Sequence, residues 1–428
     1  MPDQAKTTVS QKFAESLLWR RLKIIGLLVL IGSGIMFGFI WYQEAALREA
    51  RLLLEQNQAS RALTLIDDWQ TEHRMSDASQ ALRARCLVDL GRYSAAIQIF
   101  ETVGGNSADE VHAWATAHLH LQQWSNALPL LQLAMQKDPE NVDMLHELAA
   151  CQAKLGQLND AVETAHEFIE KSPDPHRGLL LLGVLYQQLG NKEQAAEAWN
   201  KIEEHDPEFA DLQIPPEEFL TQLAGLELDL GHLKRVRELA QKSLTYSETA
   251  VAFFLLGQAE DQLGNQADAE IAWQKSLDLD PTQVRTREAL ARIAISRGDA
   301  EQAEELLKPV IENTQIGSST AYLMERIAIR QKDQDKAQQW RERTEKLRSH
   351  EQIEAALSQM LRENPNSYWG LVVRCYRFAQ NQNWQQATEI ISSIPVREGE
   401  HEFVLQLRKS IKQKSAVPPL ELVPIKNF

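Results

Sequence analysis

An alanine recurs at a nearly constant interval along most of this 428-residue chain. Five of the eight intervals between members of the series are 34 residues long, and the others are 31, 41 and 33. The series comprises Ala62, Ala96, Ala127, Ala161, Ala195, Val236, Ala269, Ala303 and Ala337. Because a fixed period gives every unit the same neighbours, it predicts a stack of similar units, each contacting the next.

Each unit is expected to contain two short helices. Large apolar residues recur at helical spacing in the first helix, as at Leu179 and Leu182, and the second helix offers Ala195 and Trp199 to them. Glycines suited to a left-handed turn end the first helices, at Gly91, Gly156, Gly190, Gly231, Gly264 and Gly298. Neither helix covers its apolar stripe alone, so the sequence predicts an all-α solenoid of stacked helix pairs.

One unit carries most of the resemblance to a known family. Leu182 and Gly183 with Tyr186, followed by Ala195, Trp199 and Pro207, resemble the tetratricopeptide repeat, a helix-turn-helix of 34 residues. The resemblance covers residues 43–346 as about nine repeats, and a degenerate repeat is expected over 347–396 around Ala387. It implies a right-handed superhelical solenoid that binds peptide segments or partner proteins in a groove and is not an enzyme.

Residues 22–42 are apolar apart from one charge, at Lys23. A helix of this length would span ~31 Å, close to the ~30 Å hydrocarbon core of a membrane. Trp19, Trp41 and Tyr42 flank the run, so it is predicted to be an uncleaved, single-pass transmembrane anchor. Within it, Gly34 and Gly38 either pack two membrane helices into a homodimer or have this spacing by chance.

The basic residues beside this anchor predict its orientation. Five Lys or Arg residues lie before or at its start, four of them in residues 1–21 and the fifth at Lys23, and three follow within residues 43–61. This difference places the short N-terminus, 1–21, in the cytoplasm. The repeats are then expected outside the cytoplasm, on a bacterial cell membrane because no Asn-x-Ser/Thr sequence follows the anchor. The alternative is a cytoplasm-facing adaptor in envelope assembly or quality control, which three unpaired cysteines favour.

The net charge of −15 argues against general nucleic-acid binding, which requires a basic surface. The charge is uneven, since residues 24–284 carry −21 and residues 285–428 carry +3. The cysteines, at Cys86, Cys151 and Cys375, form no Cys-x-x-Cys pair and are expected to be buried as small apolar residues.

Two histidines occupy matching positions in consecutive units. Asp109 and His112 in one first helix correspond to Asp143 and His146 in the next. Three alternatives remain for this His/Asp wall: the site of a metal-dependent enzyme, a polar surface that helps to bind a partner, or ordinary solvated surface. The chain lacks a phosphate-binding loop and a catalytic serine motif, so no catalytic residue, cofactor or metal is expected.

The family's inner-face positions define a candidate groove that is apolar in its middle and basic in its later part. It suits a peptide with apolar anchors and some acidic residues. The alternative is that Leu180, Val184 and Phe254 pack against the next repeat. The candidate groove residues are Arg177, Leu180, Val184, Thr221, Phe254, Gln258, Arg285, Arg292, Tyr322 and Arg326.

The C-terminal end is predicted to contain one helix over 397–414 and a proline-rich, extended tail over 415–428. The tail is either a disordered end or a segment that docks on the solenoid or on another protein.

Overall fold

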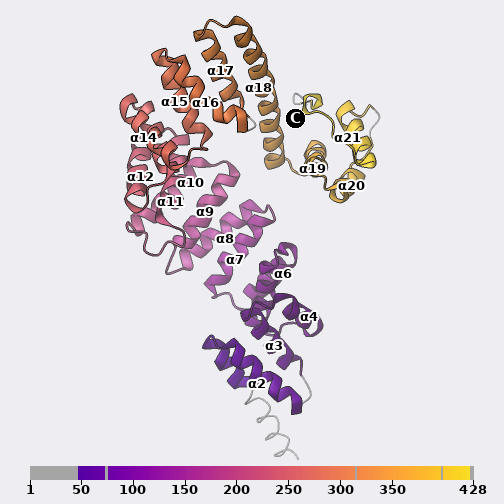
Figure 1. Ribbon diagram of the computed structural model, residues 1–428. Coiled ribbons are helices and arrows are strands. Elements are labelled where there is room, and N and C mark those ends of the chain that lie inside the picture. Colours follow the sequence, from indigo (N-terminus) through magenta and orange to yellow (C-terminus); the bar gives the residue numbers. More distant parts are fainter. Residues whose placement is uncertain (1–46, 73–75, 314–315, 397–398, 425–428) are drawn as a thin grey trace, which may run out of the picture. The chain divides into compact units, whose positions relative to one another are not determined.

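The structure is a computed structural model that describes residues 47–72, 76–313, 316–396 and 399–424 (Figure 1). These residues form helices and no strands. The helices are α2 (Ala59–Glu72), α3 (Asp77–Asp89), α4 (Tyr93–Val103), α5 (Ala108–His120), α6 (Trp124–Lys137), α7 (Val142–Lys154), α8 (Leu158–Lys171), α9 (His176–Leu189), α10 (Lys192–His205), α11 (Pro216–Asp229), α12 (Leu233–Tyr246), α13 (Ala250–Gln262), α14 (Gln266–Leu279), α15 (Val284–Arg297), α16 (Ala300–Asn313), α17 (Ser318–Arg330), α18 (Gln334–Glu363), α19 (Tyr368–Gln380), α20 (Trp384–Ser393), α21 (Glu402–Gln413) and the 3₁₀ helix η1 (Leu420–Leu422).

The helices pack in consecutive pairs, as the period predicts. The chain divides into two compact units, Met1–Gln188 and Leu189–Phe428. In the first unit, α3 packs with α4, α5 with α6 and α7 with α8. In the second, the pairs are α11 with α12, α13 with α14, α15 with α16, α17 with α18 and α19 with α20. Each unit is therefore a solenoid of stacked helix pairs.

The turn inside each pair requires a left-handed residue. All six predicted glycines have positive φ, from 73° at Gly91 to 89° at Gly264 and Gly298. After other first helices, residues other than glycine adopt the same conformation; examples are Gln122, Lys332 and Gln382. The glycine pattern in the sequence therefore identified some of these turns and missed others.

The periodic alanines form the buried seam of the fold. Eight of the nine positions in the series have side chains that are 0% exposed, and the ninth, Ala337, is 7% exposed. Trp199 and Trp273, four residues after Ala195 and Ala269, are each 1% exposed. The prediction that all three cysteines are buried is also confirmed. Burial raises the pKa of Cys86 and Cys375 to about 12, so these thiols remain protonated.

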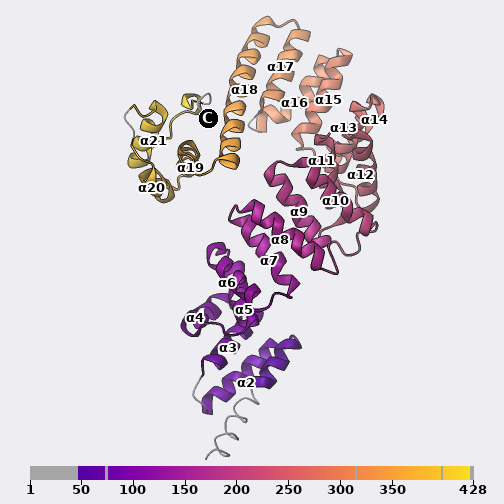
Figure 2. The same cartoon turned by 180° about the vertical axis from the view of Figure 1, so that it is seen from behind.

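The predicted boundary at 346/347 is wrong, because it falls inside α18, one continuous helix of 30 residues. Its first part packs on α17, and α19 and η1 also contact it (Figures 1 and 2). Glu351, in the middle of α18, accepts hydrogen bonds from Ser318 N at 2.8 Å and Ser318 Oγ at 2.5 Å, at the start of α17. These bonds lower the pKa of the Glu351 carboxyl. A long-range contact thus caps α17 and fixes the path of α18.

The C-terminal segment is more ordered than a free tail. The predicted helix over 397–414 is shorter, at Glu402–Gln413. Leu420 and Val423 are 3% and 7% exposed, and they pack in one apolar core with residues of α18, α19, α20 and α21. The docking alternative is therefore confirmed for residues 415–424, while 425–428 lie outside the described residues.

The predicted N-terminus over 1–21, the membrane anchor over 22–42 and its Gly34 and Gly38 lie outside the described residues. Among the helices that the structure does describe, none combines the length and apolar character needed to cross a membrane.

Candidate functional site

The predicted groove residues all lie on first helices of pairs, namely α9, α11, α13, α15 and α17. They differ in accessibility. Val184, Arg285, Arg292, Tyr322 and Arg326 are exposed. The intermediate members are Arg177, Leu180, Thr221 and Gln258, and Phe254 is buried. The inner-face pattern therefore contains both surface and core positions.

Phe254 belongs to the core. Its side chain is 8% exposed, and its carbonyl oxygen accepts a hydrogen bond from Trp273 Nε1 at 3.2 Å. Burial favours the alternative that this residue packs against its neighbours. Thr221 also satisfies its hydroxyl locally, because Thr221 Oγ1 donates to the carbonyl oxygen of Glu217 at 2.9 Å. Neither residue offers a free group to a peptide.

The His/Asp wall in the first unit is a ladder of pairs between successive helices. Arg85 binds Asp109 at 2.9 Å, and His112 Nε2 lies 2.7 Å from Glu147 Oε2. In the next step, Arg177 contacts both Asp143 and His146, each at 3.3 Å. The wall therefore links neighbouring helices through side chains that lie roughly one repeat apart.

This ladder does not assemble a metal centre. No group of three or more His, Cys, Asp or Glu side chains in the described ranges is arranged to hold a metal ion. Burial lowers the pKa of His146, and the nearby positive charge of Arg177 lowers it further. His146 is therefore neutral at pH 7, which suits a hydrogen-bond acceptor for Arg177.

The structure brings three predicted groove residues together in one pocket of the second unit. Arg292 of α15 and Tyr322 and Arg326 of α17 line a volume of about 350 Å³. Ile295, Ser296, Ser319 and Leu323 complete the lining. Arg326 Nη1 donates a hydrogen bond to Tyr322 Oη at 3.0 Å. We call this the basic pocket.

A further arginine beside the basic pocket comes from α18. The guanidinium carbon of Arg348 lies 5.5 Å from the centre of the Tyr322 ring, and that of Arg326 lies 5.9 Å away. Both distances are typical of cation–π contacts. Arg348 was not among the predicted groove residues, because the regular repeats were expected to end at 346. The absence of glycine and proline between Gln334 and Glu363 was the signal that could have predicted a continuous helix there.

The two arginines that line the basic pocket form no ion pair with another described residue, whereas the charge of Arg348 helps to lower the pKa of Glu351. Among the described residues, Arg292, Arg326 and Arg348 form no ion pair within 4.0 Å, whereas Arg297 binds Glu270 and Arg341 binds Glu325. Guanidinium groups donate paired hydrogen bonds that match a carboxylate. The basic pocket can therefore accept an anionic group from outside the chain. Arg285 is exposed but does not line this pocket.

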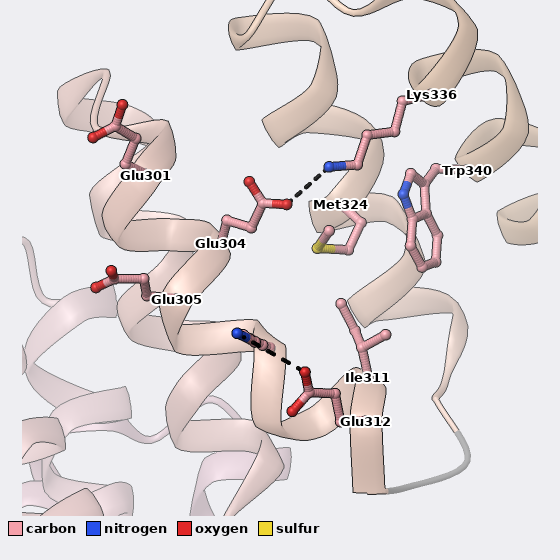
Figure 3. A pocket seen from close by; sticks show the side chains of 9 residues that line it. Glu301, Glu304, Glu305, Ile311, Glu312, Met324, Lys336 and Trp340 are labelled. Carbon is pink, nitrogen blue, oxygen red and sulfur yellow. Dashed lines mark hydrogen bonds and ion pairs between the residues drawn. The ribbon is translucent and has the colours of Figure 1, made fainter.

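A second cleft, of opposite charge, lies between α16 and α18 (Figure 3). Its volume is about 600 Å³. In Figure 3, Glu304 of α16 reaches toward Lys336 of α18, and Met324 of α17 lies between α16 and Trp340. The carboxylates of Glu301 and Glu305 lie at the outer edge of α16 and point away from Met324 and Trp340. The residues that line it are Glu301, Glu304, Glu305, Lys308, Ile311, Glu312, Met324, Lys336 and Trp340. This cleft was not predicted from the sequence, since all its lining residues except Met324 come from the second helices α16 and α18. We call it the Trp340 cleft.

Comparison with known proteins identifies the repeats. Residues 118–176 match a family model described as a tetratricopeptide repeat, and residues 47–109 and 152–211 match a second model with the same description. Anaphase-promoting complex subunit 7 from Dictyostelium discoideum is 24% identical over 189 residues, which are 44% of this chain and 31% of that protein. The chain thus matches about a third of the length of this curated relative.

Two solved structures are similar in fold. A tetratricopeptide repeat protein from Parabacteroides merdae is 19% identical, with a TM-score of 0.45, over 57% of this chain and 94% of that one. The C-terminal part of a repeat-containing protein from Cytophaga hutchinsonii is 18% identical, with a TM-score of 0.47, over 57% and 98%. The family models thus identify residues 47–109 and 118–211 as similar to tetratricopeptide repeats, and the later helices of the chain also pack in consecutive pairs.

Proposed function

We propose that the chain is a membrane-anchored scaffold that binds an acidic segment of a partner protein at the basic pocket. Tetratricopeptide repeats indicate a protein–protein interaction scaffold. The observation that supports this site is the presence of Arg292 and Arg326 in one pocket without a carboxylate partner among the described residues.

Both charge and shape favour an acidic segment that also carries an apolar side chain. Arg292 and Arg326 repel each other, which destabilises the fold. The chain has more acidic than basic residues, yet no described acidic residue forms an ion pair with either arginine. A ligand carboxylate would supply the missing partner. The exposed face of Tyr322, with Ile295 and Leu323 beside it, would accept an apolar side chain of the same segment.

The anchor and its orientation belong to the same proposal. Residues 22–42 would hold the repeats at a bacterial cell membrane, with the N-terminus in the cytoplasm and Gly34 and Gly38 available for pairing with a second copy. The chain would act by binding and not as an enzyme. A reporter enzyme whose activity requires disulfides, fused after Phe428, is expected to be active, since disulfides form outside the cytoplasm. Inactivity of a full-length fusion would reverse the orientation.

The basic pocket can be tested by charge reversal. Replacing Arg292 and Arg326 together by glutamate is expected to weaken binding of a short glutamate- and leucine-rich peptide roughly tenfold or more. The reason is that repulsion replaces two attractive contacts. Fluorescence anisotropy of the labelled peptide, titrated with the full chain, measures this change.

A matched control separates the pocket from general charge. Lys234 and Arg362 are exposed on α12 and α18, and neither forms an ion pair with another described residue. Their double replacement by glutamate changes the net charge equally and should leave the affinity within about twofold of the unaltered chain. Equal weakening by both double variants would show that the peptide responds to net charge and would refute the pocket.

A further inference from the structure

The Trp340 cleft lies on the other side of α17 from the basic pocket. Tyr322 and Arg326 are four residues apart and share one face of this helix, whereas Met324 is two residues from each. Two residues correspond to a rotation of about 200° in an α-helix. Met324 accordingly lies at the Trp340 cleft (Figure 3), and the residues that line the two sites lie on different surfaces of the same helix.

The floor and one wall of the cleft are apolar. Met324 is 2% exposed and packs in a core to which Trp340 and Ile311 contribute as partly buried residues. Trp340 and Ile311 therefore leave part of their apolar surface uncovered inside a cleft of about 600 Å³. An opening of this kind has room for an apolar side chain of another molecule.

The rim of the cleft is acidic. Four glutamates and two lysines line it, and both lysines already have a partner. Lys336 Nζ lies 2.8 Å from Glu304 Oε1, and Lys308 lies 4.0 Å from Glu312. Glu301 and Glu305 are exposed and have no ion pair with another described residue. Among the residues that line the cleft, carboxylates thus exceed cations by two, and Arg343, whose guanidinium carbon lies 5.1 Å from the centre of the Trp340 ring, is a further cation beside it.

The spacing of the two unpaired carboxylates fits a helical ligand. Glu301 and Glu305 are four residues apart on α16, a rise of about 6 Å. Basic residues four apart on a ligand helix have the same separation and face the same side. An apolar residue on the neighbouring stripe of that helix would lie toward Trp340.

We propose that the Trp340 cleft binds a basic amphipathic helix of a partner protein. Lysine or arginine side chains of this helix pair with Glu301 and Glu305, and an apolar side chain packs against Trp340 and Met324. The argument rests on the apolar floor together with the complementary charge of the rim, and it does not depend on the basic pocket.

The experiment uses the full chain and a short amphipathic peptide of leucine and lysine. Replacing Glu301 and Glu305 by lysine is expected to weaken binding, followed by calorimetry, roughly tenfold or more. Both residues are exposed, so the fold should persist. Exposed Glu163 and Glu170 of α8, replaced by lysine, provide a control with the same change in net charge.

The proposed contact between the peptide and Trp340 can be followed separately by tryptophan fluorescence. Binding of the peptide should shift the tryptophan emission, and Trp340→Phe should remove most of that shift while the peptide still binds. The Arg292 and Arg326 double variant should bind this peptide normally. Three results would each overturn the proposal. They are equal weakening of binding by the Glu163 and Glu170 control, equally tight binding of a peptide of leucine and glutamate, and an emission shift that Trp340→Phe leaves unchanged.

Discussion

Trp273→Ala is expected to lower the free energy of unfolding by about 3–5 kcal/mol, the usual cost of removing a buried aromatic side chain. Trp273 is 1% exposed in α14, and its Nε1 donates a hydrogen bond to the carbonyl oxygen of Phe254. The substitution would leave a cavity between α13 and α14. Urea denaturation followed by circular dichroism measures the change, and Gln274→Ala on the exposed side of α14 should cost less than about 0.5 kcal/mol.

A second substitution tests why this ring fits. A Cβ added at Gly257 would lie 2.4 Å from Trp273 Cδ1, so Gly257→Ala should also destabilise the chain. In the Trp273→Ala background the clash is gone, and the same change should become stabilising by up to about 1 kcal/mol because alanine favours helix. If the two changes simply add, the ring and Gly257 are not coupled and the packing argument fails.

The packing around Trp273 shows why much of the fold could be predicted from sequence. An alanine at a nearly constant interval, followed four residues later by a tryptophan in two of the units, is a local pattern that predicts both the helix pair and its buried face. Ala195 and Trp199 were predicted at this interface and are buried, as are Ala269 and Trp273 at the matching positions of a later unit. The pattern needs no knowledge of distant contacts.

The candidate site was only partly predictable, because apolar residues have two possible uses. Phe254 was predicted to anchor a peptide but lies in the core, since an apolar residue on a first helix can serve either purpose. Arg292, Tyr322 and Arg326 were placed on the accessible face, as expected for side chains that are costly to bury.

Features that depend on distant contacts were missed. Arg348 reaches Tyr322 only because α18 continues beyond the expected repeat, and a bond between Glu351 and Ser318 fixes that helix. The Trp340 cleft likewise arises where second helices of successive pairs face each other. The 34-residue period predicts which two helices form a pair. It does not predict the space between the second helix of one pair and the second helix of the next.

Gly370→Ala is expected to destabilise the C-terminal helices by about 3 kcal/mol, at the upper end of the range for overpacking. A Cβ at Gly370 would lie 2.1 Å from the carbonyl oxygen of Asn364 and 2.8 Å from the backbone of Pro365. Both obstacles are backbone atoms in the turn between α18 and α19, so no side chain can rotate away. Gly370 N also donates to Ser367 Oγ at 3.0 Å, the cap of α19.

Because the damage is local, limited proteolysis should cut the variant in residues 364–424 at a protease concentration that leaves the unaltered chain intact. Gly225→Ala provides the matched control, since Gly225 lies inside α11 and a Cβ there would meet no atom within 4 Å. That control should be neutral or stabilising by up to about 1 kcal/mol. Equal resistance of the two variants would mean that the turn relaxes around the added methyl group, and that Gly370 does not hold α19 against the end of α18.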